Sequence, residues 1–384
     1  MKEYQTQYKQ YLLENVVPFW EKHCPDREYG GYFTCLDRDG SVYDTEKYMW
    51  MQWRIVWMFA ELYNKVERRQ EWLDEALQGF RFLTRHGKDP QGRYYFSLNR
   101  EGVPAMAPYN AFSDCFAVMG AAALFRATGS EEARREALSA YECYSGRESR
   151  PKGEWTKELE GKKEYMSFGF YMMQLNLLSV LQENLGSDNS RELARLRRFV
   201  LDTFYSPSHG VVFENMPREG GPDLSSMAGR HTNPGHALEA MWFIMSSARR
   251  AGEEETVRQA ADIVLAELDY GMDREDGGIY YFLDYLRKPH VELQWDMKLW
   301  WVHCEALIAA FLAYEYTGDS RFRDRFAELH EWTWKRFPDP EYGEWFGYLD
   351  RRGEVNNTLK GGKWKTFFHL PRMLQTIGCF GEDR

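Results

Sequence analysis

Apolar residues follow a helical period in twelve successive segments of the chain. One set is apolar almost all round and covers residues 47–68, 110–127, 164–184, 232–251, 294–317 and 366–380. The other set carries charges along one face and covers residues 2–24, 71–88, 131–145, 190–205, 254–271 and 320–337. A helix that is apolar all round is buried, whereas a helix with a polar face meets water. The alternation therefore predicts six inner and six outer helices.

A glycine-aromatic phrase recurs between the helical segments. It stands at residues 30–33, 92–96, 210–213, 277–282 and 343–348, and a degenerate copy, Gly153-Glu154-Trp155, fills the one double gap. Each phrase predicts a short strand that enters a glycine-containing turn. Six such units predict an all-α (α/α)6 barrel with short β-hairpins at one end, around a central pocket. An open helical solenoid, which binds proteins on its concave face, is the competing architecture.

Composition narrows the class of protein. No linker rich in proline, glycine or serine divides the 384 residues, so we expect a single domain over 1–384. The net charge of −10 argues against nucleic acid as a partner, and no apolar run approaches the roughly 20 residues that span a membrane. Without a signal peptide at the N-terminus, we expect a cytoplasmic protein with six reduced cysteines. An aromatic content of 16% suits sugars, which alternate C–H and O–H surfaces.

Polar residues interrupt four of the six apolar segments at similar positions. Arg54 lies in the first segment, Glu305 in the fifth and His369 in the sixth, followed by Arg372 one helical turn on. His236 opens the fourth segment after Asn-Pro-Gly, and Glu239 follows on the same helical face. Taken singly, each residue has a structural interpretation, such as a helix cap or a buried ion pair. A toroid directs all of them at one pocket, so together they predict a site.

Several phrases resemble the N-acylglucosamine 2-epimerase family over essentially the whole chain. They are Gly30-Gly31-Tyr32-Phe33-Thr34-Cys35-Leu36-Asp37-Arg38, Phe112-Ser113-Asp114-Cys115-Phe116, Asn233-Pro234-Gly235-His236, Lys298-Leu299-Trp300-Trp301-Val302-His303, Glu344-Trp345-Phe346-Gly347-Tyr348-Leu349 and the run from Leu359 to Arg372. So many matches in fixed order are specific. The resemblance implies an (α/α)6 barrel, in agreement with the six units.

The resemblance also implies roles for single residues. His236, His369, Arg54 and Glu305 match the catalytic positions of the family. We expect the substrate to be bound by Glu239, Arg372, Trp301, Asn110 and Tyr48. One departure concerns the third inner helix, where N-acetyl sugar epimerases usually carry Pro-Met and this chain has Tyr171-Met172. Because that helix helps to line the pocket, the preferred sugar is less firmly implied than the reaction.

The implied reaction interconverts N-acetyl-D-glucosamine and N-acetyl-D-mannosamine. Once the ring is open, His236 and His369 would exchange the C2 proton on opposite faces, and Arg54 would stabilise the charge on O1. No metal or cofactor is required. The family also implies a homodimer and activation by ATP without hydrolysis, for which the basic stretch Lys360-Gly361-Gly362-Lys363 is a candidate contact.

Three alternatives stay open at this point. An epimerase or aldose–ketose isomerase could act on mannose, cellobiose or another unmodified sugar. A glycoside hydrolase or lyase would need two opposed carboxylates, for which Glu239 and Glu305 are available. A pure protein-binding role would leave the paired histidines without a task.

Overall fold

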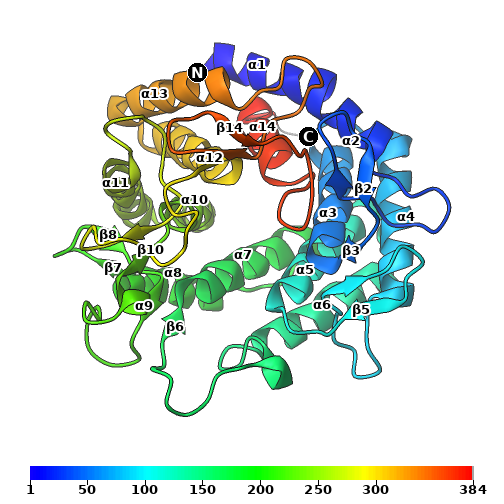
Figure 1. The fold of residues 1–384 in the computed structure, drawn as a ribbon, viewed down its shortest axis with the longest axis horizontal. Coiled ribbons are helices and arrows are strands. Elements are labelled where there is room, and N and C mark those ends of the chain that lie inside the picture. Colours follow the sequence, from blue (N-terminus) through cyan, green and yellow to red (C-terminus); the bar gives the residue numbers. More distant parts are fainter. Residues whose placement is uncertain (383–384) are drawn as a thin grey trace.

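The alternation of apolar and amphipathic segments produces two concentric rings of helices (Figure 1). The computed structural model describes residues 1–382. Within these residues the inner ring has six helices, α3 (Met49–Lys65), α5 (Ala111–Thr128), α7 (Phe168–Leu185), α10 (Pro234–Ala251), α12 (Trp300–Thr317) and α14 (His369–Gly378). The outer ring has α1 (Lys2–Tyr11) with α2 (Val17–His23), then α4 (Gln70–His86), α6 (Glu131–Ser145), α8 (Ser190–Phe204), α11 (Glu254–Gly271) and α13 (Ser320–Arg336). The predicted (α/α)6 barrel is confirmed.

The inner helices form because apolar side chains cover almost their whole circumference. In α12, the twelve consecutive positions from Val302 to Ala313 are all buried, including the aromatic Phe311. Helix α5 is long and apolar enough by composition to cross a membrane, yet most of it is buried inside the protein, as expected of a core helix. Left-handed glycines end several inner helices, among them Gly129 and Gly318, and turn the chain outward.

The first outer segment is one long element with a local change of pitch. A π-helical turn, Leu12–Val16, separates α1 from α2, and Pro18 stands in the first turn of α2. Proline lacks the amide hydrogen that an α-helix needs four residues after its acceptor, which accounts for the altered ladder just before it. The single predicted helix 2–24 is therefore interrupted.

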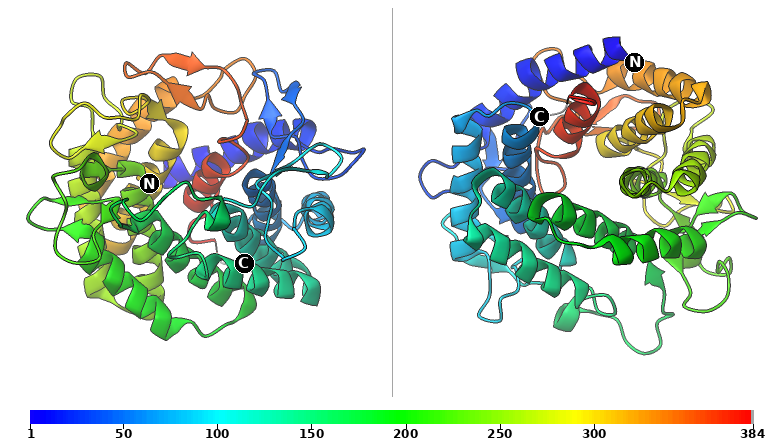
Figure 2. Two further views of the ribbon diagram at one scale, coloured as in Figure 1. Left: turned by 60° about the horizontal axis from the view of Figure 1, so that its bottom comes forward. Right: turned by 180° about the vertical axis from the view of Figure 1, so that it is seen from behind.

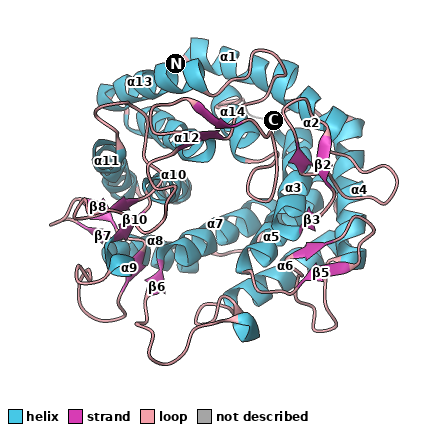
Figure 3. Cartoon of the chain, viewed as in Figure 1, coloured by secondary structure: helices cyan, strands magenta, loops and turns pink. Residues whose placement is uncertain are grey.

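Short strands lie in the connections around the ring (Figure 3), and four of them come directly before inner helices. The sheets are β1 (Cys35–Leu36) with β2 (Val42–Asp44); β3 (Lys47–Tyr48), β4 (Ser97–Leu98) and β5 (Pro104–Met106); β6 (Met166–Ser167) with β9 (Asn215–Met216); β7 (Tyr205–Ser206) with β8 (Val211–Val212); β10 (His231–Thr232) with β11 (Leu283–Asp284); and β12 (Lys298–Leu299), β13 (Tyr348–Leu349) and β14 (Val355–Asn357). All the pairings are antiparallel.

The sixth copy of the glycine-aromatic phrase was expected to be a strand, and this expectation is wrong. Gly153-Glu154-Trp155 forms one turn of 3-10 helix on an exposed connection between α6 and α7. The phrase has one aromatic residue and no β-branched residue beside it, whereas the other copies have two or more consecutive aromatic residues or, at residues 210–213, two valines before a phenylalanine. Trp155 is therefore half-exposed and has no buried surface to hold a strand in place.

A buried lysine–aspartate pair recurs in three of the connecting loops. Lys47 pairs with Asp26 at 2.9 Å, and Lys298 pairs with Asp273 at 2.9 Å. In each pair the other carboxylate oxygen accepts backbone amide hydrogens from its own turn. A buried charge is tolerated only when it is paired and hydrogen-bonded, as here. These pairs hold the loops that surround the mouth of the barrel.

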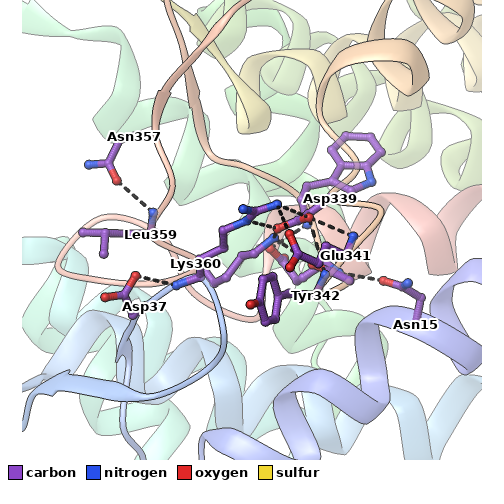
Figure 4. Close-up of polar contacts among 12 residues, drawn as sticks. Asn15, Asp37, Asp339, Glu341, Tyr342, Asn357, Leu359 and Lys360 are labelled. Atoms are coloured by element: carbon purple, nitrogen blue, oxygen red, sulfur yellow. Dashed lines mark hydrogen bonds and ion pairs between the residues drawn. The ribbon is translucent and has the colours of Figure 1, made fainter.

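The third pair joins the two ends of the ring (Figure 4). Asp339 in the last unit receives Lys360 at 2.8 Å and a bidentate contact from Arg38 of the first unit, at 2.8 and 3.0 Å. Asn15 accepts a hydrogen bond from the backbone of Glu344 at 2.7 Å. Contacts between the first and last units close the ring, so the open solenoid is excluded (Figure 2).

Candidate active site

The cavity at the N-terminal ends of the inner helices has a volume of about 560 Å³. Its lining includes six of the predicted site residues, which are Arg54, Glu239, Arg372, Trp301, His236 and His369. Aromatic rings and three methionines, Met172, Met173 and Met297, make up much of the remaining wall. A mainly apolar cavity with a few convergent polar groups is the usual form of a small-molecule site.

His236 is held in the first turn of α10. Asn233 caps this helix by accepting the backbone amide hydrogen of His236, and Pro234 fixes the entry of the chain. The imidazole Nδ1–H donates to the carboxylate of Glu214, at 3.0 and 3.1 Å from its two oxygens. Burial lowers the pKa of His236, but the neighbouring Glu214 carboxylate outweighs it and raises the pKa above 6.5. His236 is therefore disposed to hold a proton near neutral pH.

His369 begins α14 and is held by a different carboxylate. Its Nδ1–H donates to Glu305 at 2.8 Å, and Glu305 also accepts the indole N–H of Trp242 at 2.8 Å. Burial, reinforced by the guanidinium groups of Arg372 and Arg54, holds the pKa of His369 well below 6.5. His369 is therefore disposed to be a neutral base. Glu305 lies behind the imidazole and outside the cavity lining, so it positions His369.

Trp301 packs next to both histidines. Its ring centroid is 5.4 Å from that of His236 and 5.7 Å from that of His369. With Nδ1 of each imidazole turned to a carboxylate, each Nε2 is left to face a ligand. Within residues 1–382, neither Nε2 has a hydrogen-bond partner. The cavity thus presents two acid/base groups next to one aromatic ring.

Glu239 and Glu305 share a single cation. Arg372 Nη2 donates to Glu239 and, at 2.6 Å, to Glu305. Oxygen and nitrogen atoms of Glu239, Glu305 and His369 lie within 4.8 Å of one another, a spacing that would suit a metal ion, but the guanidinium already contacts both carboxylates. A glycosidase needs its two carboxylates on opposite sides of the bond that it cleaves. Two carboxylates bound to one arginine do not fit that arrangement.

Arg54 differs from Arg372 because no carboxylate bonds to it. Within the described part of the chain its guanidinium makes no hydrogen bond, and it is surrounded by the rings of Phe116, Phe368 and Trp50 at 4.0, 4.7 and 5.1 Å. Burial lowers the pKa of Arg54 to about 9, which still leaves it charged at neutral pH. An unpaired buried cation at the cavity wall is prepared to receive a negatively charged oxygen.

Two residues predicted to bind substrate lie outside the cavity lining. Asn110 caps α5, where its side-chain oxygen accepts the backbone amide hydrogen of Phe112 at 2.8 Å. Tyr48 precedes α3 on β3 and packs its ring edge-on against Phe96 at 5.7 Å. Both residues sit at the start of an inner helix, the right end of the barrel, but their contacts are structural.

Two further expectations are corrected by burial. Tyr171 points away from the cavity, where its hydroxyl bonds to Glu148 and its ring packs against α8, while Met172 faces the cavity. The departure from Pro-Met therefore does not alter the cavity wall at Tyr171. Lys360 is fully buried between Asp339 and the carbonyl of Gly343, so it is not available to a nucleotide phosphate.

Sequence reasoning missed Glu214, because the partner of His236 was sought on its own helix. Glu214 lies just before β9, and its backbone is held between the start of α7 and β10 by hydrogen bonds to Phe168 and His231. The available signal was its position directly after Val211-Val212-Phe213, one of the repeated aromatic phrases. The pairing itself depends on contacts between three separate units.

A closed barrel with two carboxylate-backed imidazoles and an unpaired guanidinium defines an acid/base enzyme. A family model for N-acylglucosamine 2-epimerase matches residues 31–372. The N-acylglucosamine 2-epimerase of Bos taurus is 40% identical over 375 residues, which is 94% of this chain and 87% of that protein. The human enzyme of the same name is 38% identical over 372 residues, with 94% and 86% covered.

Solved structures share the barrel fold of this chain. A solved cellobiose 2-epimerase from Bacillus thermoamylovorans has a TM-score of 0.84 at 20% identity, with 98% of this chain and 99% of that chain covered. At such low identity the likeness establishes the barrel fold alone. The chain belongs to the N-acylglucosamine 2-epimerase family.

Proposed function

We propose that the protein interconverts N-acetyl-D-glucosamine and N-acetyl-D-mannosamine by moving the proton on C2. The relatives that are 38–40% identical over 94% of the chain carry this activity in their names. The observation that carries the mechanism is the placement of His236 and His369 in one cavity, each next to Trp301 and each with a carboxylate at Nδ1.

Inversion at C2 requires a hydrogen bound to carbon to leave as a proton. That hydrogen is acidic only when C1 is a carbonyl, so the open-chain aldehyde is the reacting form. One histidine takes the proton from one face, which leaves an enolate across C1 and C2. The other histidine then gives a proton to the opposite face. Histidine suits both tasks because its pKa lies near neutrality and shifts readily with its surroundings.

Arg54 stabilises the intermediate. The negative charge of the enolate rests largely on O1, and a buried guanidinium without a carboxylate partner can approach that oxygen without first breaking an ion pair. Arg372 is less free to do so because Glu239 and Glu305 already bind it. We therefore assign O1 to Arg54 and the support of His369 to Arg372.

An isotope experiment tests the reaction. Epimerisation in deuterated water should place deuterium at C2 of the product, because the abstracted proton exchanges with solvent or the second face is protonated by a solvent-derived proton. Mass spectrometry of the product measures the incorporation. Product that carries no deuterium at C2 would contradict a route through a carbanion.

A substrate panel tests the sugar. N-acetylglucosamine, N-acetylmannosamine, mannose and cellobiose should be assayed side by side with the same enzyme preparation. We expect the two N-acetyl sugars to be converted with the highest kcat/KM. Faster turnover of mannose or cellobiose would leave the two-histidine chemistry in place and overturn the assignment of the substrate.

A further inference from the structure

A second cavity lies at the opposite end of the barrel, where the inner helices end. Its volume is about 420 Å³. Each inner helix runs from one cavity to the other. On α3, Arg54 lines the catalytic cavity and Glu61 lines the second one. On α7, Met172 lines the catalytic cavity and Ser179 lines the second one. We call this second space the rear cavity.

The rear cavity contains buried polar groups that lack partners. Ser179 is 8% exposed, and its hydroxyl makes no hydrogen bond within residues 1–382. Asn176 is equally buried, and its amide nitrogen contacts only the sulfur of Met119, at 3.6 Å. A buried hydroxyl or amide without a good partner has lost its hydrogen bonds to water, so these groups favour a ligand that offers hydrogen bonds.

The rest of the lining indicates the kind of ligand. Trp57 and Trp242 contribute aromatic surface to the rear cavity. Charges at the mouth are largely paired with one another, since Lys65 contacts Glu61 and Glu183 at 2.7 and 2.9 Å. Aromatic faces with hydroxyl and amide groups suit a neutral polyhydroxylated molecule, whose C–H faces stack while its O–H groups bond. The volume fits one sugar ring.

The rear cavity touches the groups that hold His369. Trp242 lines it and donates its indole N–H to Glu305, the carboxylate that receives Nδ1–H of His369. Arg372 lines both cavities, and its Nε has no hydrogen-bond partner within the described residues. A ligand that contacts Trp242 or Arg372 therefore acts on the support of one acid/base group.

We propose that the rear cavity is a second binding site for a neutral monosaccharide, and that its occupancy changes the rate of the catalytic site through Trp242 and Arg372. The second site is inferred from the rear cavity alone, whereas the first of the two equivalents counted below rests on the sugar proposed for the catalytic cavity. Coupling between sites needs two distinct sites and an element that contacts both, and these two residues supply the element.

Equilibrium dialysis with labelled N-acetylmannosamine tests the site directly. The native protein should bind two equivalents per chain. Ser246→Trp, which fills the rear cavity from a partly exposed position, should bind one. Thr84→Trp, at a partly exposed position on α4 outside both cavities, is the matched control and should bind two. One equivalent in all three proteins would overturn the proposal.

A milder variant guards against misfolding. Ser179→Ala removes the unpartnered hydroxyl without adding volume, so we expect the second equivalent to bind more weakly while the first is unchanged. Circular dichroism and thermal melting should match those of the native protein. Unchanged binding of both equivalents in Ser179→Ala and Ser246→Trp would assign the second equivalent to another surface.

Kinetics test the coupling. In the native protein the initial rate against sugar concentration should depart from a single hyperbola as the rear cavity fills. In Ser246→Trp it should follow one hyperbola, with kcat/KM at low sugar close to the native value. Identical hyperbolas in both proteins, together with two equivalents in dialysis, would keep the site and overturn its influence on the rate.

Discussion

The two histidines have similar hydrogen-bond partners, but their pKa values are shifted in opposite directions. Each donates Nδ1–H to a carboxylate, His236 to Glu214 and His369 to Glu305. The side chain of His236 is 27% exposed and has its carboxylate largely to itself, which raises its pKa. His369 is 10% exposed and shares Glu305 with Arg372, so burial and the guanidinium lower its pKa. The direction of each pKa shift is therefore set by burial and by the other charges near the carboxylate, and not by the carboxylate alone.

Because of this difference, we expect the two imidazoles to share one proton between them. The resting enzyme is expected to carry that proton on His236 and to keep His369 as the free base. After one turnover the proton has moved to the other imidazole, and exchange with solvent restores the resting form. Both directions of the reaction require one proton on two imidazoles, so both share the same dependence on pH.

The largest expected effect comes from removing one member of the pair. His369→Asn should lower kcat in both directions by about 10²–10⁴-fold, because general acid–base catalysis contributes about that much. Its circular dichroism should stay native, since asparagine fits the space and keeps a hydrogen-bonding group. Assays from each sugar, with Thr84→Trp as an unrelated control, measure the loss. Activity retained in either direction would contradict the two-base mechanism.

Replacing each carboxylate by an amide compares how much the two pairs contribute to stability. Glu305→Gln should destabilise the fold by about 1.5–3 kcal/mol in urea denaturation, because Arg372 loses one charged hydrogen-bond partner and keeps the other, Glu239. Glu214→Gln breaks a pair with a half-buried histidine and should cost less stability. Its main effect should be a lower pKa of His236. Equal losses of stability in both variants would show that the two pairs are equivalent.

The pH profile reports both imidazoles at once. As pH falls, kcat/KM should decline when His369 becomes protonated, at a pH below 6.5 because its pKa is lowered. As pH rises, kcat/KM should decline when His236 loses its proton, at a pH above 6.5 because its pKa is raised. The expected curve is a broad bell, and Glu214→Gln should move only its alkaline side, toward lower pH. A shift of the acid side instead would reverse the assignments.

The smallest effect concerns a residue outside the lining. Asn110→Ala removes the N-cap of α5 and should cost about 0.5–2 kcal/mol of stability. If its contacts are only structural, KM for either sugar should stay at the native value. Denaturation and steady-state kinetics on one preparation separate the two roles. A raised KM with unchanged stability would restore Asn110 to the substrate site.

The fold was largely predictable because it rests on local patterns. The inner helices begin and end within a few residues of their predicted limits, and the period of the apolar residues accounts for this. His236, His369 and Arg54 could be predicted from the sequence for the same reason, since each is a polar residue near the start of an apolar helix. Ring closure by Arg38 and Asp339 could not be predicted from local patterns, because it joins residues 301 positions apart.

Other parts of the site depend on which way a side chain turns. Tyr48 and Asn110 occupy the correct end of their helices, yet one packs sideways and the other turns back onto the backbone. Tyr171 and Met172 are neighbours that face opposite ways. Helical position alone places a residue at a level of the barrel, and only packing against the next helix decides whether it faces the cavity.

The meeting of the first and last units has a consequence for how this chain can be rearranged. Gln5 donates to the carbonyl of Phe380 at 3.1 Å, and Lys9 contacts Glu382 at 2.7 Å, so the two ends of the described chain lie side by side. A short linker across them, with new termini opened in the exposed connection around residues 156–163, preserves every helix of both rings. The order of the units along the polypeptide is therefore separable from their order around the barrel, and a circular permutant should keep both cavities.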